Sequence, residues 1–227
     1  MDKNSESISC IIAAHNEEER ITSVLEVVSK YKKFKEIIVV DDGSKDKTSR
    51  MVRRFKNVKL ISYRKNKGKT FAVIRGISAS RGDFLFLLDA DLIKLNNKNL
   101  DDLIQPVLKN RADVSIAILK TSFLIFKILG FDFVSGQRFF HRSLLEKEDM
   151  SKINGYGFEP FMNKKIIKNK LRIAVVKWDN VINLRKSKKA GFFKGVWQDY
   201  IAVWHTARVS GIFGMLRQMF FMPSLKN

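Results

Sequence analysis

The first 120 residues alternate short apolar runs with stretches of helical periodicity, and this alternation constrains the fold more than any other feature of the chain. Parallel strands joined by crossover helices produce such a pattern. The run 84–88 is apolar throughout, so we expect a central strand with both faces covered. The pattern predicts an α/β fold. Its expected strands are 8–13, 36–40, 58–62, 84–88 and 113–118, and its expected helices are 17–31, about 51–55, one after 68, and 100–108.

The chain is strongly basic, with 43 Lys or Arg against 23 Asp or Glu and a formal charge of +20 over 227 residues. Its 45% apolar residues exclude a disordered chain. A single cysteine, Cys10, excludes a disulfide framework. An anionic membrane face or a phosphate-bearing substrate fits the charge. We expect no nucleic-acid partner, because the basic residues are scattered without an aromatic stacking sheet or a recognition helix.

The chain shows neither of the two sequence signals for crossing a membrane. Residues 1–6 are polar and of mixed charge, so no secretory signal is predicted. The longest stretch free of Asp, Glu, Lys and Arg is 7–16, far shorter than the ~20 apolar residues of a spanning helix. We therefore expect a cytoplasmic protein.

Polar residues follow the predicted strands at the edge where open α/β sheets bind ligands. Two acids flanking one residue, as in Asp89 and Asp91, suit a hard divalent cation that shares a diphosphate. Lys67 and Lys69 can meet the phosphates. Ordinary turns and helix caps are the alternative for each segment taken alone. The residues that converge at this edge are His15, Asn16, Glu17, Asp41, Asp42, 64–69, Asp89 and Asp91.

Four segments, in this order and spacing, resemble the GT-A glycosyltransferases of family 2. They are 11–18 (IIAAHNEE), 39–44 (VVDDGS), 66–69 (NKGK) and 88–92 (LDADL). Further on, 135–140 (SGQRFF) is similar to a Ser-Gly-x-Arg segment of the dolichyl- and polyprenyl-phosphate sugar transferases. Segments 155–159 (GYGFE) and 185–188 (RKSK) match that branch more loosely. The resemblance implies a GT-A fold, which is Rossmann-like with a mainly parallel sheet.

The resemblance also implies roles for individual residues. Asp89 and Asp91 match the family's DxD motif and would hold Mg²⁺ or Mn²⁺ on the donor diphosphate, where the ion acts as a Lewis acid. Asp91, Glu159 and Arg138 form the implied catalytic set. The implied nucleotide-binding residues are Ala14, Asn16, Glu17, Asp41, Asp42, Lys69 and Asp89. The residues implied to bind an acceptor phosphate or the leaving group are Gln137, Arg138, Arg185 and Lys188.

The nature of the acceptor decides what Glu159 does. Family 2 enzymes invert the anomeric carbon, so a hydroxyl acceptor needs a general base, and Glu159 is the candidate. A lipid phosphate is already anionic and needs none, which leaves Glu159 an orienting role. The ordinary alternative is a helix N-terminal acid beside Pro160. Ile93 stands where the lipid-phosphate branch commonly has Gln, so the acceptor class stays open.

The end of the chain is basic and aromatic. Residues 164–194 hold eleven Lys or Arg and one acid. Trp197, Ile201 and Trp204 follow at spacings of four and three, which predicts amphipathic helices. Such a tail suits an anionic membrane surface, or it packs on the catalytic domain or a second subunit. His205 is a candidate third metal ligand, although a lone helical histidine is more often structural.

Together these features predict a nucleotide-sugar-binding half over 7–120, an acceptor-binding half over 121–191 and a helical tail over 192–227. The predicted function is a metal-dependent inverting glycosyltransferase. It moves a sugar from a UDP- or GDP-sugar to a membrane-associated acceptor, such as a polyprenyl phosphate, at the inner face of the cell membrane. The alternatives are transfer to a soluble phosphorylated acceptor such as a phosphoglycerate, and a non-catalytic nucleotide-sugar-binding module.

Overall fold

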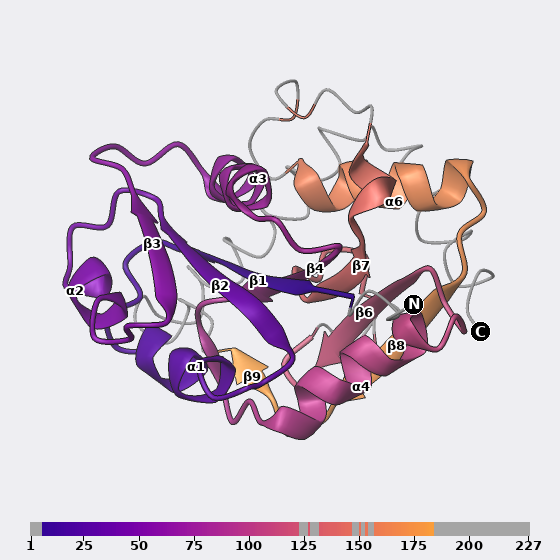
Figure 1. The fold of residues 1–227 in the computed structure, drawn as a ribbon, viewed down its shortest axis with the longest axis horizontal. Coiled ribbons are helices and arrows are strands. Elements are labelled where there is room, and N and C mark those ends of the chain that lie inside the picture. Colours follow the sequence, from indigo (N-terminus) through magenta and orange to yellow (C-terminus); the bar gives the residue numbers. More distant parts are fainter. Residues whose placement is uncertain are drawn as a thin grey trace, which may run out of the picture.

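The computed structural model describes residues 6–122, 127, 132–146, 150, 153 and 157–183. At its centre lies a seven-stranded sheet of order β3-β2-β1-β4-β7-β6-β8, with a separate two-stranded ribbon, β5-β9 (Figure 1). The sheet strands are β1 (Ile8–Ala14), β2 (Phe34–Asp41), β3 (Val58–Ser62), β4 (Phe84–Asp89), β6 (Val114–Leu119), β7 (Arg138–His141) and β8 (Ile173–Trp178). The ribbon strands are β5 (Leu92–Ile93) and β9 (Ile182–Asn183).

The sheet is parallel except for one strand. β1 pairs in parallel with β2 and β4, and β2 pairs in parallel with β3. β7 runs antiparallel to both β4 and β6, while β6 and β8 are parallel to each other. The mainly parallel sheet expected from the sequence is therefore confirmed. The strands β1, β2 and β4 end at one edge, called here the carboxyl edge.

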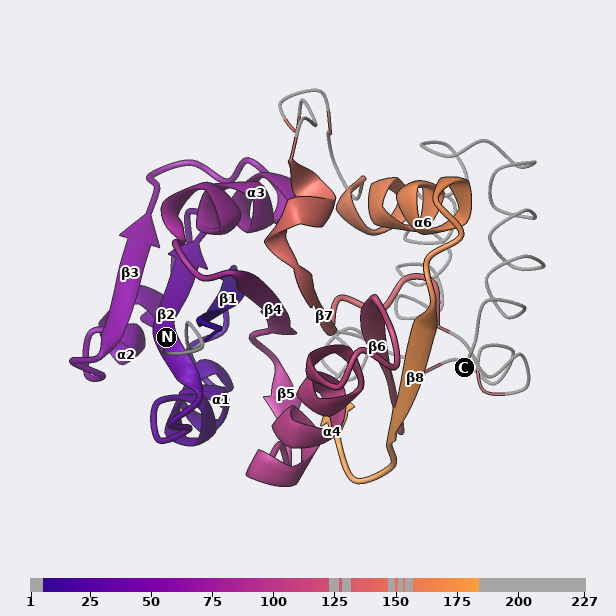
Figure 2. The same ribbon diagram turned by 45° about the vertical axis from the view of Figure 1, so that its right-hand side comes forward.

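Helices cover both faces of the sheet (Figures 1 and 2). α1 (Ile21–Val28) and α4 (Asn97–Leu108) lie on one face, and α3 (Lys69–Ala79) and α6 (Phe158–Lys168) lie on the other. The short helix α2 (Thr48–Val52) packs beside α1, and the 3-10 turn η1 (Arg142–Leu145) follows β7. This three-layer arrangement leaves the carboxyl edge open to ligands.

The central strand β4 is buried on both faces, as its apolar run predicts. Phe84, Phe86 and Leu88 join the core beneath α1 and α4. The alternate residues Leu85 and Leu87 join the core beneath α3 and α6. Because successive strand side chains point to opposite faces, one unbroken apolar run fills both cores.

The first helix is shorter than the predicted 17–31 segment, because the residues before it form a turn. The backbone N–H of Glu17 donates to Thr48 Oγ1 at 2.7 Å, and that of Glu18 donates to Asp46 Oδ2 at 3.1 Å. These long-range bonds hold the turn that leads into Ile21. The predicted tail, 192–227, lies outside the described residues. Among the described residues, no helix is both long and apolar enough to span a membrane.

Candidate active site

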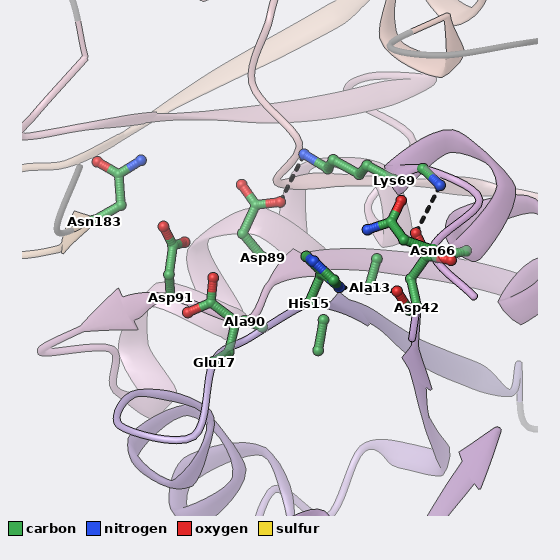
Figure 3. A pocket seen from close by; sticks show the side chains of 13 residues that line it. Ala13, His15, Glu17, Asp42, Asn66, Lys69, Asp89, Ala90, Asp91 and Asn183 are labelled. Carbon is green, nitrogen blue, oxygen red and sulfur yellow. Dashed lines mark hydrogen bonds and ion pairs between the residues drawn. The ribbon is translucent and has the colours of Figure 1, made fainter. Parts of the chain in front are cut away.

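A pocket of about 440 Å³ opens at the carboxyl edge of the sheet (Figure 3). Residues from the ends of β1, β2 and β4 line it, together with the loop before α3 and one residue of β9. The polar residues in its lining are His15, Glu17, Asp42, Asn66, Lys69, Asp89, Asp91 and Asn183, and the others are Ala13, Ala14, Gly68, Ala72 and Ala90. Most of the strand-end residues expected from the sequence thus meet in one cavity.

Asp42 fixes one wall of the pocket. Its carboxylate accepts hydrogen bonds from the backbone N–H groups of Lys67 at 2.9 Å and Gly68 at 2.7 Å. These bonds tie the loop before α3 to the end of β2. Gly43 makes the close approach possible, because it has φ +71° and a Cβ there would lie 2.6 Å from the backbone nitrogen of Asn66.

His15 and Asn16 complete the turn at the end of β1. His15 Nδ1 lies 2.9 Å from the Asp42 carbonyl oxygen, and Asn16 Nδ2 lies 3.1 Å from His15 Nε2. The Asn16 amide therefore donates to Nε2, and Nδ1 of a neutral ring donates to the carbonyl. Asn16 Oδ1 accepts from the backbone N–H of Lys45 at 2.9 Å. Ala14 and His15 face the pocket, whereas Asn16 does not line it.

The DxD acids lie at the end of β4 with carboxylates directed into the pocket (Figure 3). Within the described part of the chain, no hydrogen bond or ion pair engages the Asp91 carboxylate. Burial and the negative charges of Asp89 and Glu17 raise the pKa of Asp91 to about 7, against the opposing charges of Lys69 and Arg20. The three carboxylates are thus crowded.

Lys69 sits at the first turn of α3 and joins two acids from distant segments. Its Nζ lies 2.8 Å from Asp89 Oδ1 and 3.1 Å from Glu159 Oε1. Burial alone would lower the pKa of the Lys69 ammonium, but the two carboxylate charges and hydrogen bonds outweigh burial and raise it. Lys69 therefore stays charged and holds Asp89 in place.

The second half of the chain reaches the same site through β7. Because β7 is antiparallel to β4, the residues before its first residue lie at the carboxyl edge. Gln137 Nε2 donates to Asp89 Oδ2, and Gln137 Oε1 accepts from Ser135 Oγ at 2.9 Å. A Cβ at Gly136 would lie 2.7 Å from Lys69 Nζ and 2.8 Å from Asp89 Oδ1. Only a residue without a side chain leaves room for this ion pair.

The donor set fits a divalent cation that is completed by a ligand. Among the described residues there is no group of three or more His, Cys, Asp or Glu arranged to hold a metal ion. Asp89 and Asp91 offer carboxylate oxygens, and Mg²⁺ or Mn²⁺ suits two carboxylates plus substrate phosphates. Burial and, after it, the neighbouring negative charges raise the pKa of Asp91, and a bound cation would counter both effects by stabilising the ionised carboxylate. His205, the candidate third ligand, lies outside the described residues.

Arg138 does not take the phosphate-binding position expected from the sequence. Its side chain is fully buried, and its guanidinium donates to the carbonyls of Ser135 at 2.8 Å and Phe133 at 3.0 Å and to Asn163 Oδ1 at 2.7 Å. Burial lowers its pKa to about 10, opposed by the charges of Glu159 and Asp132. Arg138 instead fixes the segment that carries Gly136.

Four further residues expected at the site are placed as follows. Asp41 is buried behind the pocket, where its carboxylate accepts from the Ser44 N–H at 3.0 Å and from the Ser49 hydroxyl; this is the turn-capping alternative. Glu159 lies in the first turn of α6 behind Lys69 and is absent from the lining of the 440 Å³ pocket. Arg185 and Lys188 lie outside the described residues, as do 155 and 156 of the Gly-Tyr segment.

Two residues of the site were not expected. Gly136 was part of a quoted motif, but its contact with Lys69 and Asp89 depends on strand pairing across 47 residues or more. Asn183 lines the pocket from β9 and belongs to no motif quoted above. No local signal predicts the contact that Gly136 makes or the position of Asn183, because both residues reach the site through long-range pairing.

Comparison with known proteins identifies the family. The family model for glycosyl transferase family 2 matches residues 9–157, which include all four motifs at the carboxyl edge. The chain belongs to glycosyl transferase family 2.

Similar proteins include several that act on lipid phosphates by name. A dolichyl-phosphate beta-glucosyltransferase of Dictyostelium discoideum is 30% identical over 178 residues, which cover 71% of this chain and 50% of that protein. The human dolichyl-phosphate beta-glucosyltransferase is 34% identical over 105 residues, 40% of this chain and 32% of that protein. The chain thus spans half or less of these relatives.

Solved structures share the fold. Glucosyl-3-phosphoglycerate synthase from Mycobacterium tuberculosis, in complex with Mn²⁺, UDP-glucose and phosphoglyceric acid, has a TM-score of 0.64 at 22% identity. The match covers 76% of this chain and 69% of that one. This similarity confirms the GT-A fold expected from the sequence.

Proposed function

We propose that this protein is a metal-dependent inverting glycosyltransferase that moves glucose from UDP-glucose to a polyprenyl phosphate at a membrane surface. One observation carries the proposal: the acids of the family motifs, Asp42, Asp89 and Asp91, meet with Lys69 in one pocket. The relatives named for dolichyl-phosphate glucosylation support the acceptor class. The structural neighbour with bound UDP-glucose and Mn²⁺ supports the donor and the ion.

The positions of the pocket residues suggest a role for each in binding the nucleotide sugar and the ion. Asp42 and Ala14 would face the nucleoside, while Asp89 and Asp91, with the Glu17 carboxylate beside them, would hold the ion against the diphosphate. When bound, the ion supplies Lewis-acid stabilisation of the leaving nucleoside diphosphate. Lys69 and Gln137 hold the Asp89 carboxylate in one orientation before any ligand arrives, which is the preorganisation that transfer chemistry needs.

The position of Glu159 favours a phosphate acceptor over a hydroxyl. A general base must lie within hydrogen-bond reach of the proton that it removes. Glu159 is 7% exposed, is paired with Lys69, and does not line the pocket. An anionic lipid phosphate needs no base to attack the sugar. Glu159 then acts as a positioning residue that holds Lys69 beside Asp89.

The experiment measures release of nucleoside diphosphate from UDP-glucose and GDP-mannose with Mn²⁺. Each donor is tested with polyprenyl phosphate in anionic vesicles and with soluble 3-phosphoglycerate, and EDTA is added in a parallel series. We expect turnover only with UDP-glucose, only with the lipid phosphate, and none in EDTA.

Each other outcome points to a named alternative. Turnover with phosphoglycerate and without lipid would identify the soluble-acceptor enzyme. Binding of UDP-glucose without turnover on either acceptor would identify a non-catalytic module. Absence of both binding and turnover with either nucleotide sugar would refute the proposal.

A further inference from the structure

Strand β9 brings Asn183 beside the DxD motif. In the two-stranded ribbon, Leu92 pairs with Asn183 and Ile93 pairs with Ile182. Leu92 directly follows Asp91, so the pairing places Asn183 next to the metal-binding motif. Asn183 lines the pocket from the side opposite Asp42 (Figure 3).

The Asn183 amide is oriented by Thr121. The Thr121 hydroxyl donates to Asn183 Oδ1, and it accepts the backbone N–H of Asn183 at 3.2 Å. The single proton of the threonine hydroxyl is directed at the amide oxygen, and a lone pair of the same hydroxyl oxygen accepts the backbone N–H. The amide nitrogen consequently points away from Thr121, toward Asp89 and Asp91 in Figure 3.

This nitrogen is an available donor in the pocket. No hydrogen bond joins Asn183 Nδ2 to any other residue that the structure describes. The Asn183 amide nitrogen has a fixed direction because the amide oxygen is held by Thr121, so it can donate a hydrogen bond to an oxygen atom of a bound ligand. Asp89 and Asp91 would bind the cation. The oxygen that accepts from Asn183 then belongs to the ligand that this cation binds.

The distance between neighbouring strands indicates which end of a bound nucleotide sugar would lie beside Asn183. Asp42 follows β2 and Asp89 ends β4, with β1 between them. Neighbouring strands lie ~4.8 Å apart, so these two positions are separated by about two strand spacings. A nucleoside held at Asp42 fills that interval, and its diphosphate then reaches β4. Asn183 lies on the far side of Asp91, where the diphosphate–sugar end would extend.

We propose that Asn183 binds the diphosphate–sugar end of the nucleotide sugar, with Nδ2 donating a hydrogen bond to a β-phosphate oxygen or a sugar hydroxyl. The inference rests on the proposed function. Thr121 is the positioning residue that aims this donor. Asn183 thereby distinguishes a nucleotide sugar from a nucleoside monophosphate.

The test compares dissociation constants of UMP, UDP and UDP-glucose, measured by calorimetry with Mn²⁺, for the wild-type chain and Asn183→Ala. Loss of one hydrogen bond to a bound ligand weakens binding by about tenfold. We expect that loss for UDP-glucose and no change for UMP. A tenfold loss for UDP as well assigns the contact to a phosphate oxygen, whereas unchanged UDP assigns it to the sugar.

Variants at Thr121 separate orientation from folding. Thr121→Val removes the hydroxyl and should weaken UDP-glucose binding several-fold, while Thr121→Ser keeps the hydroxyl and should restore it. Asn180→Ala is the matched control in the same segment, because Asn180 donates to the Lys94 carbonyl at 2.8 Å and bonds Asn99 but does not line the pocket. It should lower the melting temperature without changing the ratio of UMP to UDP-glucose affinity.

Three results would overturn the inference. In the first, Asn183→Ala binds UMP, UDP and UDP-glucose with affinities within twofold of wild type. In the second, Asn183→Ala loses as much affinity for UMP as for UDP-glucose. In the third, Asn180→Ala changes the ratio of UMP to UDP-glucose affinity as much as Asn183→Ala does. In each case the wild-type chain still binds UDP-glucose, so the proposed function survives. A wild-type chain that binds none of the three nucleotides refutes both.

Discussion

The two halves of the sheet deliver residues to the site in opposite ways. In the first half, β1, β2 and β4 run parallel, and the residues at their carboxyl ends line the pocket. In the second half, β7 runs antiparallel, so the residues before it, Gly136 and Gln137, reach the same edge. Arg138, one residue further, already lies within the strand and is buried. Strand direction thus decides which polar residue of a motif meets the ligand.

Arg138→Ala tests this difference most strongly. The substitution removes a fully buried side chain and its hydrogen bonds to Asn163 Oδ1 and to the carbonyls of Ser135 and Phe133, of which the Phe133 carbonyl still accepts from Asn163 Nδ2 at 2.7 Å. Cavity formation and unsatisfied buried acceptors together should lower the free energy of unfolding by about 3–5 kcal/mol. For a chain of this length, that corresponds to a melting temperature lower by roughly 10 °C.

Arg75→Ala is the control, because Arg75 lies exposed on α3 and should change stability by less than about 0.5 kcal/mol. The phosphate-binding role first expected of Arg138 makes the contrary prediction. Arg138→Ala would then keep the wild-type melting temperature and lose activity alone.

Asp91→Asn tests the parallel half. Asp91 faces the pocket, and its carboxylate forms no hydrogen bond or ion pair with another described residue that would stabilise the fold. We expect the rate of UDP release to fall by roughly a hundredfold or more, while the melting temperature rises or stays the same because a crowded negative charge is removed. Asp102→Asn, on the outer side of α4 and paired with Lys98, is the matched control. A rate for Asp91→Asn within threefold of wild type would exclude metal binding by the DxD motif.

Substitution of one glycine from each half should have different effects: a loss of stability in the first half and a loss of turnover in the second. Gly43 follows β2 with φ +71° and meets backbone atoms, so Gly43→Ala should cost about 1–3 kcal/mol of stability. Gly136 meets the end of the Lys69 side chain and the Asp89 carboxylate, which can move aside. Gly136→Ala should therefore leave the melting temperature nearly unchanged and slow turnover roughly tenfold, through the lost ion pair. Equal destabilisation by both changes would contradict this distinction.

The sequence predicted the first half well because its information is local. The strand 58–62 has the predicted bounds, and the Asp-x-Asp and Asp-Asp-Gly-Ser segments lie at the strand ends where parallel topology puts them. The same reasoning misplaced Arg138 and missed Asn183. Both depend on antiparallel pairing with β4 or β5 across 51 residues or more, and nothing near them in sequence records which strand they will join.

Glu159→Gln should have the smallest effect on turnover. It tests whether the second half of the sheet supplies a catalytic group or only supports the site. Glu159 comes from α6 in the second half, yet it acts on the site only by holding Lys69 beside Asp89. Gln keeps a hydrogen-bonding oxygen for Lys69, so turnover with a polyprenyl phosphate should fall less than tenfold. A general base would behave otherwise, because its removal costs about 10²–10⁴-fold. A loss in that range, with substrate affinity unchanged, would show that the acceptor is a hydroxyl and that the second half supplies catalysis as well as support.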